Sequence, residues 1–200
     1  MSIREGVKRR LPFFLGLLLI LGAFVVLLRI FGPVAQAELH YQQGKNNPSQ
    51  SAVIPCPESS FTISIPKLNL CASVIPQVDP YDSYIYQRAL TQGVAHAKGT
   101  SLPGQEGNIF LFAHSAGNPL DASRYNSLFY LLAKLNPGDA ITLSYQGTKY
   151  SYVVDHLTKV NPNELQYLTN SHDDTLTLMT CWPPGTTLKR LLVVAKPVAM

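Results

Sequence analysis

A cysteine and an arginine, nine residues apart near the carboxyl end of the chain, are the residues whose chemistry stands out first. Cys181 ends a run in which polar and apolar residues alternate, and Arg190 directly precedes a continuous apolar run. A cation beside a thiol favours the thiolate, which is the nucleophilic form. A cation beside a nucleophile can also stabilise an oxyanion. The pair therefore predicts one half of a cysteine acyl-transfer site.

Two strands must position this pair. The alternating run at residues 175–180 predicts a half-buried strand, and the apolar run at residues 191–195 predicts a strand that is buried on both faces. Residues 183–185, Pro-Pro-Gly, cannot continue a sheet ladder and predict a turn between the two strands. If the strands pair as an antiparallel hairpin, Cys181 and Arg190 lie at the same end of the sheet.

An acyl-transfer site also needs a general base, and His114 is the best placed of the five histidines. It follows residues 108–113, which predict a short apolar strand, and it precedes a loop. If this strand lies parallel to the strand that ends at Cys181 and next to it, the imidazole and the thiol meet at one edge. His172 is a rival base, but it stands beside two aspartates in a polar turn.

Three segments in this order resemble the sortases, the cysteine transpeptidases of bacterial surfaces. Residues 177–181 read TLMTC, which is similar to the TLxTC signature of that family. Residues 189–193 resemble its arginine-bearing last strand, and residues 107–114 resemble its catalytic-histidine segment. A spaced FxxLxxLxxGD pattern also matches, at Phe129, Leu132, Leu135, Gly138 and Asp139. The resemblance covers approximately residues 61 to 196.

The resemblance implies a reaction and a role for each site residue. Cys181 would attack a backbone carbonyl in an LPxTG-like sorting motif of a surface protein and form a thioacyl enzyme. His114 would transfer protons, and Arg190 would hold the oxyanion. An amine of peptidoglycan or of a pilin would then resolve the thioacyl enzyme, without a cofactor. The residues expected to contact the substrate or orient the site are Thr180, Ala113 and Trp182; Trp182 has capping of the barrel as an alternative role.

The elements predicted from the pattern suit a mostly β protein. A hairpin signal, Gln146-Gly147, separates the fourth and fifth predicted strands. Together with the final pair, the pattern gives a mostly antiparallel, closed sortase-like β-barrel of about seven to eight strands with two or three short helices. The predicted strands are residues 61–65, 71–75, 108–113, 140–145 and 149–160, residues 93–97 are extended or irregular, and the predicted helical segments are residues 84–90, 124–135 and 163–168.

The amino-terminal region predicts a membrane anchor. Residues 11–28 carry no charge, and eighteen helical residues span about 27 Å, most of a hydrocarbon core of about 30 Å. Four basic residues precede them, so the amino terminus is expected in the cytoplasm and the rest outside. The predicted organisation is a cytoplasmic segment at 1–10, a transmembrane signal anchor at 11–33, an extracytoplasmic linker at 34–60 and a catalytic domain at 61–200. A cleaved signal peptide is the alternative, because Ala35-Gln36-Ala37 fits a cleavage site.

The charge balance excludes a nucleic-acid surface. Residues 1–37 hold five Lys or Arg and one Glu, whereas residues 38–200 hold eleven Lys or Arg and eleven Asp or Glu. The net charge of +4 therefore belongs to the predicted anchor. A nucleic-acid-binding domain needs basic residues clustered on the folded part of the chain.

The three cysteines leave two readings open. A Cys56–Cys71 disulfide would leave Cys181 as the single free thiol, whereas the alternative is a buried Cys71 and a free Cys56. No Cys or His pattern has the spacing of zinc ligands. Glu106 stands nearly alone in the loop where some sortases bind calcium, so no metal is expected.

Three other classes of protein are alternatives to a sortase. A cell-wall L,D-transpeptidase places its nucleophile in a SHGCxR-like motif, which residues 179–182 do not match. A papain-like peptidase has its cysteine early and its histidine downstream, and here the order is reversed. A non-enzymatic extracytoplasmic β-barrel that binds a surface partner remains the alternative to an enzyme.

Overall fold

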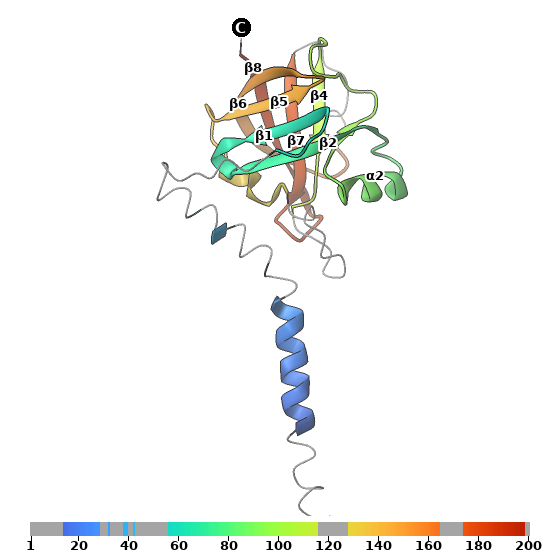
Figure 1. Ribbon diagram of the computed structural model, residues 1–200, viewed down its shortest axis with the longest axis vertical. Helices are drawn as coiled ribbons and strands as arrows, with labels where there is room; N and C mark the ends of the chain where they lie inside the picture. The colour runs from blue at the N-terminus through green and yellow to red at the C-terminus, as the bar shows by residue number, and fades with distance from the viewer. Residues whose placement is uncertain are drawn as a thin grey trace, which may run out of the picture.

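Eight strands close into one barrel in the computed structural model, which describes residues 14–28, 32, 38–39, 42, 56–115, 128–164 and 174–198. Around the barrel the strands follow the order β1-β2-β3-β4-β7-β8-β6-β5 (Figure 1). The closed, mostly β barrel predicted from the sequence is therefore confirmed. The strands are β1 (Phe61–Ile65), β2 (Leu70–Val78), β3 (Val94–Ala97), β4 (Asn108–Phe112), β5 (Ala140–Tyr145), β6 (Thr148–Val160), β7 (Thr175–Trp182) and β8 (Lys189–Pro197).

The pairings are mostly antiparallel, with two exceptions. β2 pairs with β3 in parallel, and β4 pairs with β7 in parallel. The other six pairings are antiparallel. The β4–β7 pairing matters for chemistry, because parallel neighbours end at the same edge of a sheet.

The barrel interior is filled by side chains that alternate along the strands. In β7 the apolar Leu176 and Leu178 are fully buried, as the predicted alternation requires. In β1 and β5 the same spacing buries Ile63 and Leu143. Each buried aliphatic side chain of this size contributes about 1.5–3 kcal/mol. The packed core therefore makes the barrel a rigid scaffold for the residues at its rim.

The hairpin predicted at Gln146-Gly147 joins β5 and β6. Both residues have positive φ, +49° and +82°, which is the backbone of a two-residue type I′ turn. A second glycine, Gly93, allows a close approach of the chain to β2. A Cβ atom at Gly93 would lie 2.3 Å from the carbonyl oxygen of Ser73, so no side chain fits there.

One α-helix and two short 3-10 helices accompany the barrel in the part of the chain from residue 56 onward that the structure describes. The helical turn expected at 84–90 is α2 (Ser83–Leu90), which begins where the Asp82 carboxylate accepts hydrogen bonds from the backbone N–H groups of Tyr84 and Ile85. α2 lies outside the barrel wall (Figure 1). Two 3-10 helices are also present, η2 (Pro66–Leu68) and η3 (Tyr130–Lys134).

The helix predicted at 124–135 is only a short 3-10 helix in the part that the structure describes. Only η3 is helical there, and residues 124–127 lie outside the described residues. Leu135 is already extended, and Pro137 follows, which disfavours helical backbone at the residue before it. Most of the helix predicted at 163–168 also lies outside the described residues.

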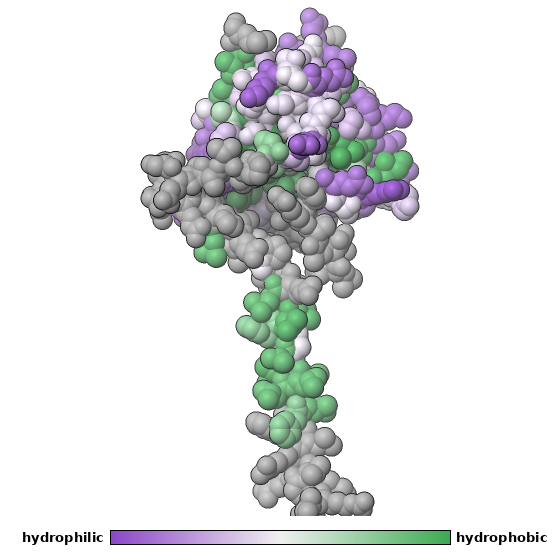
Figure 2. Space-filling model, viewed as in Figure 1, coloured by the Kyte–Doolittle hydropathy of each residue, from purple (hydrophilic) through white to green (hydrophobic). Residues whose placement is uncertain are grey.

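The described amino-terminal residues include a helix at 14–28. Most of its apolar side chains are exposed, and Figure 2 shows them on its visible face. No helix within the described ranges is both long and apolar enough to span a bilayer. The transmembrane helix predicted at 11–33 is therefore not supported by the described residues.

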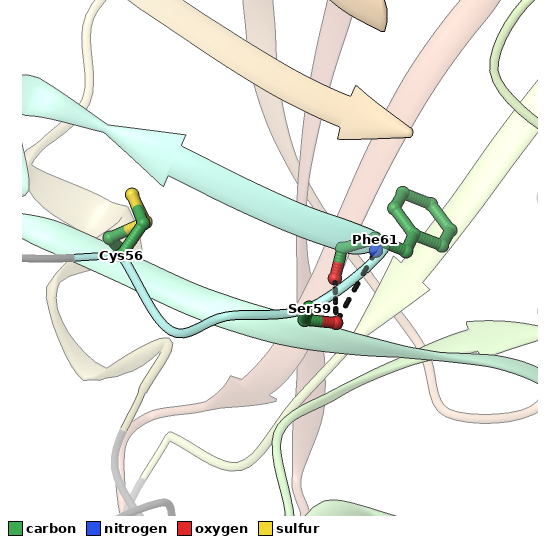
Figure 3. Close-up of a disulfide and its surroundings, with 4 residues drawn as sticks. Cys56, Ser59 and Phe61 are labelled. Carbon is green, nitrogen blue, oxygen red and sulfur yellow. Dashed lines mark hydrogen bonds between the residues drawn. A yellow bond between two sulfur atoms is a disulfide. The ribbon is translucent and has the colours of Figure 1, made fainter. Parts of the chain in front are cut away.

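A disulfide joins Cys56 to Cys71, which decides between the two readings of the cysteines. It ties the segment before β1 to β2 (Figure 3). In the same segment the Ser59 hydroxyl donates to the carbonyl oxygen of Phe61 at 3.0 Å and accepts from its N–H at 3.3 Å. Cys181 is left as the free thiol of the chain.

One histidine is built into the core. His96, in β3, is fully buried, and its Nδ1 accepts a hydrogen bond from the backbone N–H of Gln77 at 3.3 Å. Its Nε2 lies 2.9 Å from the carbonyl oxygen of Ser101 and 3.1 Å from the Thr100 hydroxyl. Burial lowers the pKa of His96, and the hydrogen bond to Ser101 opposes this change only in part. The imidazole is therefore held neutral, with the proton on Nε2.

This histidine predicts a loss of stability in mild acid. Because its pKa is lower in the folded protein, the unfolded chain takes up a proton that the folded protein excludes once the pH falls below about 6.5. We expect the free energy of unfolding to fall below that pH, by at most about 1.4 kcal/mol per pH unit from this group. His96→Gln should be less stable at pH 8 but should have a shallower slope. Urea titrations at several pH values measure both, and equal slopes in the two proteins would contradict the assignment.

Candidate active site

The hairpin at the end of the chain places a thiol opposite a guanidinium. β7 and β8 are antiparallel, and their register pairs Cys181 with Arg190. The turn between them is closed by a hydrogen bond from the N–H of Thr186 to the carbonyl oxygen of Pro183, at 3.0 Å. The relative position predicted for the two residues is therefore confirmed.

The parallel pairing of β4 with β7 brings His114 to the same edge. Phe112 pairs with Met179, and the N–H of Ala113 donates to the carbonyl oxygen of Met179 at 3.2 Å. His114 and Cys181 each follow this pair by two residues. The two residues therefore leave neighbouring strands at the same level.

A cleft of about 320 Å³ contains all three of these residues. His114, Cys181 and Arg190 line it, and both His114 and Cys181 are half-buried. Its walls also include apolar side chains of α2, β4 and β8, such as Leu90, Phe112 and Leu192. A largely apolar cleft with a few convergent polar groups is the usual form of a small-molecule or peptide site.

The Arg190 guanidinium is only weakly held by its own chain. Its Nη1 donates to the carbonyl oxygens of Thr187 and Lys189 at 3.4 and 3.3 Å, which are long hydrogen bonds. Within the described part of the chain it takes part in no ion pair. Its charge is therefore available to an anion that forms in the cleft.

The Thr180 side chain joins β7 to the end of β4, next to His114. It is buried, and its hydroxyl donates to the carbonyl oxygen of Ala113 at 2.9 Å. Both residues line the cleft, as expected of residues that contact the substrate or orient the site. The hydrogen bond gives Thr180 a positioning role, because it fixes the residue that precedes His114.

Trp182 is not brought to the cleft. Successive residues of a strand point to opposite faces, so Trp182 faces away from the side chain of Cys181. The Lys159 ammonium lies 4.4 Å from the centroid of the indole ring, a cation–π contact. Trp182 lines a separate hollow with Leu157 and Leu191. Of the three residues predicted to bind substrate, Trp182 is therefore the one that the cleft does not include.

A second clamp holds β4 to β7 at the far end of the pair. The buried Asn108 accepts hydrogen bonds through Oδ1 from the hydroxyls of Thr175 and Thr177, at 3.0 and 2.9 Å. The N–H of Gly107 also donates to the Asp174 carboxylate at 2.7 Å. These polar contacts fix the parallel register on which the position of His114 depends.

Sequence reasoning missed two parts of the cleft. Tyr81 and Tyr86 line it from the segment between β2 and β3. Glu164 lines it from the turn after β6. No local sequence pattern indicated Glu164, because it reaches the cleft through the pairing of β6 with β8, in which Val160 lies opposite Arg190. The rival base His172 lies outside the described residues. Among the described residues no group of three or more His, Cys, Asp or Glu could hold a metal ion.

Comparison with protein families matches residues 63–198 to the Sortase domain. Among solved structures, the chain is similar to sortase C-1 from Actinomyces oris, with 26% identity, a TM-score of 0.59 and coverage of 84% of this chain and 99% of that chain. It is also similar to a lid mutant of sortase A from Corynebacterium diphtheriae, with 26% identity, a TM-score of 0.58 and coverage of 78% and 77%.

A third similar structure is sortase C from Clostridium perfringens with the C-terminal cell wall sorting motif. It shares 25% identity at a TM-score of 0.59, over 84% of this chain and 88% of that one. No curated protein matches the chain significantly. The family match spans more than half of the chain and contains every strand from β2 to β8, together with the cysteine, histidine and arginine of the cleft. This chain therefore belongs to the sortase family.

Proposed function

We propose that this protein is a cysteine transpeptidase that cleaves an LPxTG-like sorting motif and joins the acyl part to an amine of the cell wall or of a pilin. The observation that carries the proposal is the cleft in which β7, β8 and the end of β4 bring together Cys181, Arg190 and His114. These are the nucleophile, the oxyanion-binding cation and the proton carrier that acyl transfer needs.

The first half-reaction forms a thioester. The Cys181 thiolate attacks the scissile carbonyl carbon, and Arg190 stabilises the oxyanion that develops on the carbonyl oxygen. The C–N bond then breaks, and the leaving amine takes a proton from the His114 imidazolium. The products are a thioacyl enzyme, a neutral imidazole and the carboxyl-terminal fragment of the substrate.

The second half-reaction makes a new amide. An incoming amine attacks the thioester carbonyl carbon, the C–S bond breaks, and the thiolate leaves with the bonding electron pair. The imidazole of His114 takes the proton that the nitrogen loses. The thiolate and the imidazolium are thereby restored for the next turnover.

The walls of the cleft suit an extended apolar peptide. The ring of Tyr86 packs edge-on against that of Phe112, at 6.4 Å between the centroids, and Leu90 lies beside them in the cleft. The leucine and proline side chains of an LPxTG-like motif present the same apolar character. The similar Clostridium perfringens sortase C, described with its sorting motif, supports this choice of substrate class.

We also propose that residues 11–33 anchor the enzyme in the cell membrane, with the amino terminus in the cytoplasm and the catalytic domain outside. The exposed apolar side chains of the helix at 14–28 support an apolar environment for that segment. The Cys56–Cys71 disulfide supports an oxidising, extracytoplasmic compartment for the domain. Substrates that leave the same membrane would then reach the cleft directly.

Cys181→Ala tests the nucleophile. We expect transpeptidation of LPxTG-like peptides to glycine amines to fall by at least about 10³-fold, because no thioester can form. Mass spectrometry of the wild-type protein should show an acyl adduct on Cys181, and thermal melting should show that the variant remains folded. An active Cys181→Ala protein would refute the role. A folded wild-type protein that binds such peptides without an adduct would instead indicate a non-enzymatic binding barrel.

Arg190→Ala tests the oxyanion-binding cation against its neighbour. Loss of the guanidinium should lower kcat/KM by about 10²–10³-fold, because the developing negative charge loses its partner. Lys189→Ala removes an exposed charge of the same sign from the adjacent position and should change kcat/KM by less than about threefold. Equal losses in the two variants would contradict the assignment of Arg190.

Thr180→Val tests the positioning of His114. The change leaves the carbonyl oxygen of Ala113 without its hydroxyl partner, which should cost about 1–3 kcal/mol of stability. We also expect kcat to fall by about tenfold or more, with little change in KM, because the imidazole is displaced. Thr177→Val is the matched control, since it removes a similar buried hydroxyl from the far end of β7. If both variants lose stability but neither loses kcat, Thr180 has only a structural role.

A further inference from the structure

Glu164 is the carboxylate of the cleft. Among the described residues that line the cleft, no other side chain is a carboxylate. It is half-buried in the turn that follows β6, where its own N–H donates to the carbonyl oxygen of Asn161 at 3.1 Å. Its Oε1 accepts hydrogen bonds from the backbone N–H and the side-chain Nδ2 of Asn161, at 3.1 and 2.8 Å. These bonds fix the direction in which the carboxylate points.

The turn does not require the charge of this carboxylate. Both hydrogen bonds from Asn161 end on one oxygen, which the amide oxygen of a glutamine could replace. No ion pair within the described ranges involves Glu164, although Arg190 lines the same cleft. A partly buried charge without a cation partner is unfavourable for the protein alone. The negative charge is therefore suited to a positive charge that arrives with a substrate.

The other charged groups of the cleft would oppose a cationic substrate. Arg190 carries a fixed positive charge, and His114 takes up a proton during aminolysis. An amine acceptor is largely cationic in neutral solution, and its nitrogen becomes positively charged again as it bonds to the carbonyl carbon. Because electrostatic interactions act strongly in a partly desolvated cleft, a carboxylate there offsets the repulsion.

We propose that Glu164 recognises the amine acceptor and stabilises the positive charge on its nitrogen during attack on the thioester. The acceptor binds as an ammonium ion and loses one proton to solvent before it attacks. The N–C bond then forms, the C–S bond breaks with the electron pair leaving on the Cys181 thiolate, and the second proton of the nitrogen passes to the imidazole of His114. Water competes for the same thioester and yields a carboxylic acid, but it arrives without a charge. Glu164 thereby favours aminolysis over hydrolysis. The inference rests on the proposed transpeptidase function and adds the residue that selects the second substrate.

The test measures how much of the thioacyl enzyme reacts with an amine to give an amide and how much reacts with water to give an acid. The p-nitrophenyl ester of N-acetylthreonine serves as the acyl donor and glycinamide as the acceptor, and mass spectrometry gives the ratio of amide to acid. This ratio does not depend on how fast the thioester forms. We expect Glu164→Gln to lower it by about tenfold at a fixed glycinamide concentration. Glu58→Gln removes an exposed carboxylate outside the cleft and should leave the ratio within about twofold of the wild type. Cys181→Ala gives the background reaction.

The salt dependence separates an electrostatic role from a structural one. Raising the salt concentration from about 50 mM to about 500 mM should lower the wild-type ratio, because ions screen the carboxylate. The Glu164→Gln ratio should not fall, because only the repulsion from Arg190 and His114 is left to screen. An unchanged ratio in Glu164→Gln, or equal losses of amide and acid, would overturn the inference. The absence of a p-nitrophenolate burst in the wild-type protein would instead contradict the proposed function, and the inference would fall with it.

Discussion

The parallel pairing of β4 with β7 is the constraint on which the site depends. Cys181 and Arg190 are close in the sequence, and a single hairpin is enough to bring them together. His114 lies 67 residues before Cys181, and only the sheet register places His114 beside the thiol. Ala113 and Thr180, which are joined by a hydrogen bond, have the same separation of 67 residues. The register is held by hydroxyl-to-oxygen bonds at both ends, from Thr177 to Asn108 and from Thr180 to Ala113. A slip of one residue would reverse every side chain of β7 and remove Cys181 from the cleft.

The cleft combines unpaired charges with apolar walls. Arg190 and Glu164 both line it, and within the described part of the chain neither is neutralised by an ion pair. Such an arrangement stabilises charges that appear during a reaction rather than charges that the resting protein already contains. The polar clamps of β4 and β7 have the opposite character, since their buried groups are satisfied within the protein. The fold therefore separates the groups that maintain geometry from those that can interact with a substrate.

The sequence predicted the parts of the molecule that depend on local pattern. Alternation in β7, the apolar run of β8 and the Gln146-Gly147 turn all follow from neighbouring residues, and the structure confirms them. The roles of Trp182 and Glu164 were harder to predict. Trp182 was expected either to contact the substrate or to cap the barrel, and its direction in the strand, opposite to that of Cys181, places it outside the cleft. Glu164 belongs to the cleft only because β6 ends beside β8, which is a long-range contact.

The central claim is that His114 and Cys181 lie side by side on neighbouring parallel strands, and a cross-link tests it most directly. Residues opposite each other in a sheet lie about 4.8 Å apart, within the range that a disulfide bridges. In the His114→Cys variant, mild oxidation should join positions 114 and 181, with a loss of about 2 Da and no labelling by iodoacetamide. Formation of this link, with the Cys56–Cys71 disulfide intact, is the result that the account predicts. Two thiols that stay separate and remain fully alkylated under the same oxidation would contradict it.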